Sequence, residues 1–297
     1  MSKNDYIILS QKSLKGLWVG DCIGQSVIKK KIKSIDDLDN IEDDSLPYTD
    51  DTEQSLILSK HVYNNDDIVS NEILNEFCNG FCNSKIQCDY GRKTKEYFNN
   101  IYKTNFVFPN NSFGNGCLMR IVPSIVYFTL NDDKDIIQKC LNSCLYTHNH
   151  IESFNSIIFL VKFIQWLVIN REEVKSYCKS ESGSIIQGYL LSKILENDIT
   201  SEILIKEINK IIDNDLYLNI KDVYKLVGNG SLATCFDTLP VCIWLAIRNI
   251  NNYKNAIEEC ISIGGDVDTI CAIVGSIVSL FSDIPQEFIN KCKKYEY

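Results

Sequence analysis

Two short acidic segments carry the residue types best suited to metal-dependent chemistry. The first is Tyr48-Thr49-Asp50-Asp51-Thr52, and its counterpart far downstream is Gly264-Gly265-Asp266-Val267-Asp268-Thr269. Each places carboxylates beside a threonine hydroxyl, and hard divalent cations such as Mg²⁺ or Mn²⁺ prefer such oxygen donors. If the fold brings the two segments together, they can hold a pair of metal ions.

Both segments precede helical patterns, so helix capping is the alternative interpretation. Negative charge at an exposed helix N-terminus contributes roughly 0.3–1 kcal/mol. For the first segment, capping and metal binding both remain open. The second segment precedes a helix that is apolar nearly all round and is therefore expected to be buried. Two carboxylates buried there repel each other and lose hydration unless a cation compensates, which favours metal binding.

A glycine-rich segment and a histidine segment are candidates for ligand binding. In Ser112-Phe113-Gly114-Asn115-Gly116, the glycines on either side of Asn115 allow backbone amides to approach a phosphate closely. A simple turn before a helix is the alternative. Arg120 suits either a phosphate contact or a structural ion pair. His148 can stack on an adenine or donate to a phosphate, and it suits a capping role equally well.

Helical periodicity dominates the remaining chain and predicts the elements that position these motifs. Loop composition covers residues 103–117 and 228–231, and residues 34–47 are turn-like. We find no repeat, linker or hairpin pattern, so we expect one compact, all-α domain spanning residues 1–297. The expected helices cover residues 16–27, a segment starting at 52, 66–83, 118–130, 135–146, 151–169, 185–195, 203–212, 220–227, 239–250 and 270–281.

Composition narrows the class of protein and its compartment. The net charge of -9 argues against non-specific binding to nucleic acid or anionic membranes. The 13 cysteines form no C-x-x-C pair, which predicts reduced, mostly buried thiols rather than a zinc site or a disulfide framework. No secretory leader or uninterrupted apolar run of about 20 residues is visible. We therefore expect a soluble protein of the cytoplasm.

The order of the motifs resembles the ADP-ribosylglycohydrolase family, which includes the dinitrogenase reductase-activating glycohydrolase. The resemblance covers nearly the whole chain. It rests on Gly20-Asp21-x-x-Gly24, Thr49-Asp50-Asp51-Thr52, the Gly114-Asn115-Gly116 motif with Met119, Arg120 and Pro123, Thr147-His148, and Gly264-Gly265-Asp266-x-Asp268-Thr269. It implies an orthogonal multi-helix domain whose cleft holds two Mg²⁺ or Mn²⁺ ions. It also implies hydrolysis of the bond between ADP-ribose and an acceptor such as an arginine, a serine or a small molecule.

The resemblance also assigns roles to individual residues. It implies Thr49, Asp50, Asp51, Asp266, Asp268 and Thr269 as metal ligands. It implies Ser112, Gly114, Asn115 and Gly116 as lining of the ADP-ribose site, with His148 near the adenosine or phosphates. We assign catalysis to Asp50 and Asp51, because carboxylates near the anomeric carbon stabilise oxocarbenium character on the ribose.

One departure from the family concerns Ile28. Many members carry a glutamate a few residues after Gly-Asp-x-x-Gly, and the matching position here is Ile28, which cannot ligate a metal or transfer a proton. Asp50 or Asp51 can take over its task, or Glu42 can approach from the acidic loop. A third interpretation is an ADP-ribose-binding or regulatory protein with weakened catalysis. A helical scaffold whose acidic pairs merely cap helices is a further alternative, and it predicts no metal dependence.

Overall fold

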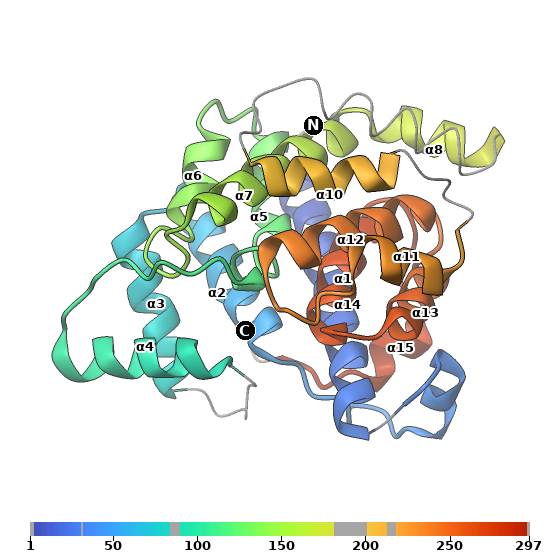
Figure 1. Ribbon diagram of the computed structural model, residues 1–297, viewed down its shortest axis with the longest axis horizontal. Helices are drawn as coiled ribbons and strands as arrows, with labels where there is room; N and C mark the ends of the chain where they lie inside the picture. The colour runs from blue at the N-terminus through green and yellow to red at the C-terminus, as the bar shows by residue number, and fades with distance from the viewer. Residues whose placement is uncertain (1–2, 31, 84–89, 181–200, 213–217, 296–297) are drawn as a thin grey trace.

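Two helices from opposite ends of the chain form the centre of the fold. Figure 1 shows α1 (Lys3–Lys30) running beside α14 (Val267–Val278), with the other helices arranged around this pair. The structure is a computed structural model that describes residues 3–30, 32–83, 90–180, 201–212 and 218–295. Within these residues every regular element is a helix, which confirms the all-α prediction.

The remaining helices follow in chain order around the central pair. They are η1 (Ile35–Asn40), α2 (Asp50–Asn65), α3 (Ser70–Asn83), α4 (Arg92–Thr104), η2 (Asn115–Cys117), α5 (Val122–Leu130), α6 (Ile136–Asn142), α7 (Ile151–Ile169), α8 (Arg171–Ser180), α10 (Glu202–Ile212), α11 (Ile220–Val227), α12 (Cys235–Arg248), α13 (Tyr253–Ile263) and α15 (Gln286–Lys291).

Three glycines, one helical turn apart on α1, set the distance between α1 and α14. A Cβ at Gly16 would lie 2.4 Å from the carbonyl oxygen of Gly275, and a Cβ at Gly20 would lie 2.1 Å from that of Cys271. At Gly24 it would lie 2.5 Å from the Cα of Asp268. The two backbones therefore touch, and the C-terminal half of α1 is fixed against the residues that begin α14.

Helix α7 is the most apolar long helix, and its position explains that composition. An 18-residue window within this 19-residue helix has a mean hydropathy of 1.4, which by length and composition alone is enough to cross a membrane. However, 61% of that window is buried inside the protein, and Phe159, Leu160 and Phe163 have no exposed surface. Burial in the core therefore accounts for the hydrophobicity of α7.

Several boundaries differ from the sequence predictions. Helix α1 begins near residue 3 rather than at 16, because the polar residues Ser10 and Ser13 lie inside the fold and donate to carbonyl oxygens of Pro123 and Ser276. The structure also contains α4, α8 and α13, which the periodicity did not reveal. The first two residues of the loop expected at 103–117 belong to the end of α4. The helix expected at 185–195 lies outside the described residues.

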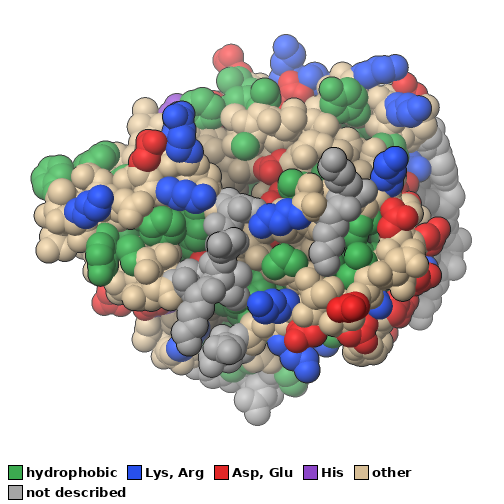
Figure 2. Space-filling model, turned by 90° about the horizontal axis from the view of Figure 1, so that it is seen from below, with side chains coloured by type: hydrophobic (Ala, Val, Ile, Leu, Met, Phe, Trp, Pro, Cys, Tyr) green, Lys and Arg blue, Asp and Glu red, His purple; other side chains and the backbone are tan. Residues whose placement is uncertain are grey.

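The cysteines named in the sequence analysis are buried, and the surface carries charges of both signs. Cys22, Cys117, Cys242 and Cys271 are buried free thiols, as expected from their apolar surroundings. Figure 2 shows basic side chains interspersed with acidic and neutral ones across one face, with acidic side chains gathered toward its lower right. Among the described residues of that face, no continuous basic stripe of the kind that tracks a nucleic acid is visible.

Candidate active site

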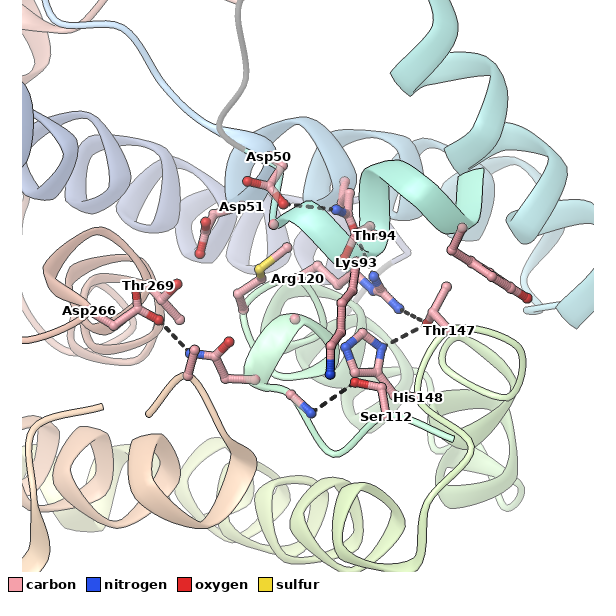
Figure 3. A pocket seen from close by; sticks show the side chains of 18 of the residues that line it. Asp50, Asp51, Lys93, Thr94, Ser112, Arg120, Thr147, His148, Asp266 and Thr269 are labelled. Atoms are coloured by element: carbon pink, nitrogen blue, oxygen red, sulfur yellow. Dashed lines mark hydrogen bonds between the residues drawn. The ribbon is translucent and has the colours of Figure 1, made fainter. Parts of the chain in front are cut away.

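One cavity collects nearly all of the residues that the sequence singled out. It has a volume of about 370 Å³ and lies between α2, the start of α4, the segment 110–120 and the start of α14 (Figure 3). Every predicted site residue except Thr49 lines it. These are Asp50, Asp51, Ser112, Gly114, Asn115, Gly116, His148, Asp266, Asp268 and Thr269. The volume is within the range of roughly 300–1,000 Å³ typical of small-molecule sites.

Carboxylates crowd one end of this cavity. Burial and, after it, the negative charge of Asp21 raise the pKa of Asp50 to about 7. Burial likewise raises the pKa values of Asp51 and Asp268 well above the ordinary value, with further contributions from neighbouring aspartates. The effect is the one expected when like charges share a desolvated site. A cation placed among these groups would relieve both desolvation and repulsion.

Asp21 positions the first acidic segment, although it was not among the predicted site residues. This fully buried aspartate follows Gly20 on α1 and accepts hydrogen bonds from the backbone N–H and hydroxyl groups of both Thr49 and Thr52, at 2.6–3.1 Å. The Gly-Asp-x-x-Gly motif therefore has two structural tasks. Its glycines bring α1 against α14, and its aspartate anchors the start of α2.

Thr49 acts beneath the cavity rather than in its wall. It is the N-cap of α2, and its hydroxyl lies 2.8 Å from a carboxylate oxygen of Asp21 and 2.9 Å from one of Asp51. A hydroxyl carries one proton, so it can donate to only one of the two carboxylates at a time. The other oxygen of Asp51, Oδ1, is buried without a hydrogen-bond partner. Because Asp51 lines the cavity, this orphaned acceptor is suited to a cation bound there.

The second acidic segment is not held by helix capping. Asp266 occupies the N-cap position of α14, yet its side chain makes no capping hydrogen bond. Its Oδ2 instead accepts from the side-chain amide of Asn115 at 2.6 Å. Asn115 also donates to the hydroxyl of Thr238 at 3.0 Å. The glycine-rich loop is thereby tied to the start of α14, which the capping interpretation does not explain.

The opposite end of the cavity is formed by the glycine-rich loop and His148. The hydroxyl of Ser112 accepts from the backbone N–H of Gly114 at 3.1 Å, which shapes the turn. A Cβ at Gly116 would lie 3.1 Å from Nε2 of His148, so glycine leaves room for the imidazole. Burial and, to a smaller extent, the positive charge of Arg120 lower the pKa of His148 to about 3, so the ring is neutral.

Sequence reasoning missed the basic side chains of α4. Gly91, Arg92, Lys93 and Thr94 line the cavity at the N-terminal end of this helix. Figure 3 shows the side chain of Lys93 extending into the cavity on the side of Ser112 and His148. The sequence shows only that two basic residues, Arg92 and Lys93, follow Gly91. Their spacing does not indicate that they lie near the acidic segments and the glycine-rich segment.

The acidic end has the ligand atoms that a hard cation prefers, but these atoms are not already arranged around an ion position. Its donors are carboxylate and hydroxyl oxygens, the ligands that Mg²⁺ and Mn²⁺ prefer. In the part of the chain that the structure describes, no three acidic, histidine or cysteine groups converge closely enough to hold an ion as they stand. A cation would have to draw the side chains of Asp50, Asp51, Asp266 and Asp268 inward.

The raised carboxyl pKa values predict an unusual pH dependence of stability. A carboxyl group with a raised pKa in the folded state stabilises the fold below its ordinary pKa, and this contribution is lost as pH rises through the folded value. For Asp21 and Asp50 that value is about 6 and about 7. We therefore expect these groups to lower the melting temperature of the metal-free protein between pH 5 and pH 8.

The measurement is thermal unfolding in EDTA across this pH range for the wild type and Asp50→Asn. Asparagine does not titrate, so the variant should lose less stability on going to pH 8, by roughly 5 °C. Parallel pH profiles for the two proteins would show that Asp50 titrates normally.

Comparisons with known proteins agree with this arrangement. A family model described as ADP-ribosylglycohydrolase matches residues 9–297. The ADP-ribosylhydrolase ARH3 of Xenopus tropicalis is 24% identical over 94% of this chain and 88% of that protein. The matches to ARH3 of Bos taurus and Homo sapiens, at 24% and 23% identity, cover 62% of this chain and 55% of each relative. They thus span about half of those proteins.

A solved structure also shares the fold. A chain titled "ADP-ribosylglycohydrolase-related protein complex" superposes with a TM-score of 0.67 over 97% of this chain and 93% of its own length. The sequence identity of 15% limits this comparison to the fold.

Proposed function

Since the chain belongs to the ADP-ribosylglycohydrolase family, we propose that it hydrolyses the glycosidic bond between ADP-ribose and an acceptor, with two Mg²⁺ or Mn²⁺ ions as cofactors. The acceptor is a protein side chain or a small molecule. The observation that carries the proposal is the cavity itself. It places Asp50, Asp51, Asp266 and Asp268 at one end and the glycine-rich loop with His148 at the other.

The residues that would hold the metal ions are those at the acidic end. Asp50, Asp51, Asp266, Asp268 and Thr269 line the cavity, and the orphaned Oδ1 of Asp51 supports this assignment. Thr49 is better suited to orient Asp51 than to bind a metal directly, because it does not line the cavity. Bound Mg²⁺ or Mn²⁺ would supply Lewis-acid polarisation and would lower the pKa of a water molecule.

The aspartates themselves suit the remaining steps of hydrolysis. Asp50, whose pKa burial raises to about 7 in the metal-free protein, can take a proton from the attacking water and give it to the departing acceptor. Gln54 donates to its Oδ2 at 3.3 Å and so orients the carboxyl group. Negative charge on neighbouring aspartates stabilises the positive character that the ribose gains when the glycosidic bond breaks.

The proposal is tested by incubating purified protein with Mg²⁺ and either ADP-ribosyl-arginine or ADP-ribosyl-serine substrates. We expect release of ADP-ribose from at least one substrate and loss of that release in EDTA. Tight binding of ADP-ribose with no turnover on either substrate would refute hydrolysis and leave only ligand binding.

Lys93 is expected to bind the diphosphate of the ligand. Its ammonium group extends into the cavity beside the glycine-rich loop, where a diphosphate would meet backbone N–H groups as well (Figure 3). We predict that Lys93→Ala weakens ADP-ribose binding roughly tenfold, equivalent to about 1.4 kcal/mol. Isothermal titration calorimetry measures this.

Lys95→Ala is the matched control for Lys93, because Lys95 is an exposed lysine of the same helix that does not line the cavity. Its affinity should equal that of the wild type. Equal weakening in the two variants would indicate only a general effect of net charge.

A second candidate function is an ADP-ribose-binding protein with weakened catalysis, and Ile28 is the observation that favours it. This residue lies on α1 at the position of the family glutamate and is 51% exposed. Neither Ile28 nor the exposed Glu42 lines the cavity. Under our main proposal the aspartates carry the reaction, so Ile28→Glu should change kcat less than about threefold.

Steady-state kinetics on the better substrate measures the effect of Ile28→Glu. A gain of tenfold or more would mean that the wild-type chain lacks a catalytic carboxylate and would favour the binding function. Ile28→Gln, which has a similar shape without the charge, is the control for altered packing.

A further inference from the structure

Arg120 is a buried cation whose hydrogen bonds all go to neutral oxygens. Its side chain is 1% exposed and lies over the ring of Phe77, with 4.5 Å from the guanidinium carbon to the ring centre. It donates to the backbone oxygen of Ser143 at 3.0 Å, to the hydroxyl of Thr147 at 2.8 Å, and to the side-chain oxygen of Gln54. A buried charge is costly to maintain, so its hydrogen bonds need a functional explanation.

The bond to Thr147 constrains where the threonine proton can go. A guanidinium group only donates, so the hydroxyl oxygen of Thr147 must accept from Arg120. Its own proton then has two possible acceptors. Nδ1 of His148 lies 2.9 Å away, and the backbone oxygen of Cys144 lies 3.4 Å away. The shorter distance favours donation to His148.

Donation to Nδ1 determines the tautomer of His148. A neutral imidazole that accepts at Nδ1 carries its proton on Nε2. That nitrogen is next to Gly116 and Gly114, at 3.1 and 3.6 Å from the positions that a Cβ would take there. Figure 3 shows the imidazole between Thr147 on one side and the cavity on the other. The ring therefore presents an N–H donor to the cavity.

We propose that Arg120 is a positioning residue that acts through Thr147 to fix His148 as the neutral Nε2–H tautomer, which donates a hydrogen bond to an acceptor atom of the ligand. This inference rests on the proposed function in one respect, namely that the ligand is ADP-ribose. Its phosphoryl oxygens and adenine nitrogens are acceptors, and a neutral donor binds them without a change of charge in the cavity.

The same guanidinium orients the acidic end of the cavity. By donating to the side-chain oxygen of Gln54, it turns the amide NH₂ group of Gln54 toward Asp50, where the 3.3 Å contact is found. Reversing the amide would place an acceptor against a carboxylate. One buried cation thus determines the direction of a hydrogen-bond donor at each end of the site.

The tautomer can be measured directly by NMR on ¹⁵N-histidine-labelled full-length protein. The chain has only three histidines, so His148 is assigned by its loss in His148→Gln. We expect the wild type to show the Nε2–H pattern and Thr147→Ser to retain it. In Thr147→Val, which keeps the shape but removes the hydroxyl, we expect a mixture of tautomers. Arg120→Met, if folded, should show the same mixture.

Binding of ADP-ribose provides the second measurement. Thr147→Val should weaken it about tenfold, and Thr147→Ser should stay within about twofold of the wild type. An Nδ1–H tautomer in the wild type, or an unchanged Nε2–H pattern in Thr147→Val, would overturn the proposal. The tautomer of His148 can be measured even if the protein binds no ADP-ribose. A failure of the proposed role of Arg120 and Thr147 is therefore distinguishable from a failure of the proposed function.

Discussion

Replacing Asp268 by asparagine is expected to reduce ADP-ribose release by on the order of 100-fold or more without lowering the melting temperature. The loss of rate follows because Asp268 is one of the carboxylates that line the acidic end of the cavity. Removing a single preorganised charged or polar group that faces a transition state commonly costs this much.

Stability should respond in the opposite direction. Burial raises the pKa of Asp268 well above its ordinary value, and the charges of Asp266 and Asp21 contribute. Ionisation of this side chain is therefore less favourable in the folded state than in the unfolded state, and a neutral asparagine removes this penalty. Its side-chain oxygen can still accept from the backbone N–H of Thr269, which the aspartate accepts at 3.0 Å. We expect a melting temperature equal to or above that of the wild type in EDTA.

The rate of ADP-ribose release and the melting temperature together distinguish a catalytic or metal-binding carboxylate from one that only caps a helix. A carboxylate that merely caps α14 would contribute roughly 0.3–1 kcal/mol, and its loss would slightly lower the melting temperature without affecting chemistry. Asp283→Asn is the matched control. Lys12 lowers the pKa of that exposed carboxyl group, so its neutralisation should cost a little stability and leave the rate unchanged. Parallel losses of helicity and activity in Asp268→Asn would contradict the prediction.

The sequence predicted the fold class and the family because both depend on local or collinear patterns. The apolar helix after Asp266 and the order of the motifs were visible without coordinates, and the match to the family over residues 9–297 confirms the resemblance. The structure also brings the two acidic segments to one cavity. Whether they bind metal stays a prediction.

The features that the sequence did not reveal depend on contacts between residues that are far apart in the sequence. Helix α4 is strongly polar, and only Tyr97, Phe98 and Ile101 form its buried stripe, so neither the helix nor the position of Lys93 could be inferred. Arg120 was expected to bind a phosphate or form an ion pair. Its hydrogen bonds go to Gln54, Ser143 and Thr147, which come from two separate segments, and a contact with phosphate stays a prediction. The link between Asp21 and the first acidic segment likewise depends on its hydrogen bonds with Thr49 and Thr52, which are about 30 residues away in the sequence.

Gly20→Ala is expected to have the largest effect on stability, because it adds one methyl group where two helix backbones touch. The new Cβ would lie 2.1 Å from the carbonyl oxygen of Cys271, far inside any tolerated contact, and neither backbone can move without separating α1 from α14. Overpacking of this kind costs about 3 kcal/mol or more, which exceeds the helix-propensity gain of about 1 kcal/mol from alanine. The melting temperature should fall by roughly 6 °C or more.

Gly20→Ala should also lower activity, for a reason unlike that in Asp268→Asn. Asp21 follows Gly20 directly and holds Thr49 and Thr52, so a shift of α1 displaces Asp50 and Asp51 from Asp266 and Asp268. Gly80→Ala is the control, since Gly80 also lies inside a helix and outside the cavity, and its Cβ would meet only the terminal methyl group of the Ile57 side chain, which can move. An unchanged melting temperature in Gly20→Ala would contradict the prediction. It would mean that the close approach of α1 and α14 does not determine the positions of the aspartates in the cavity.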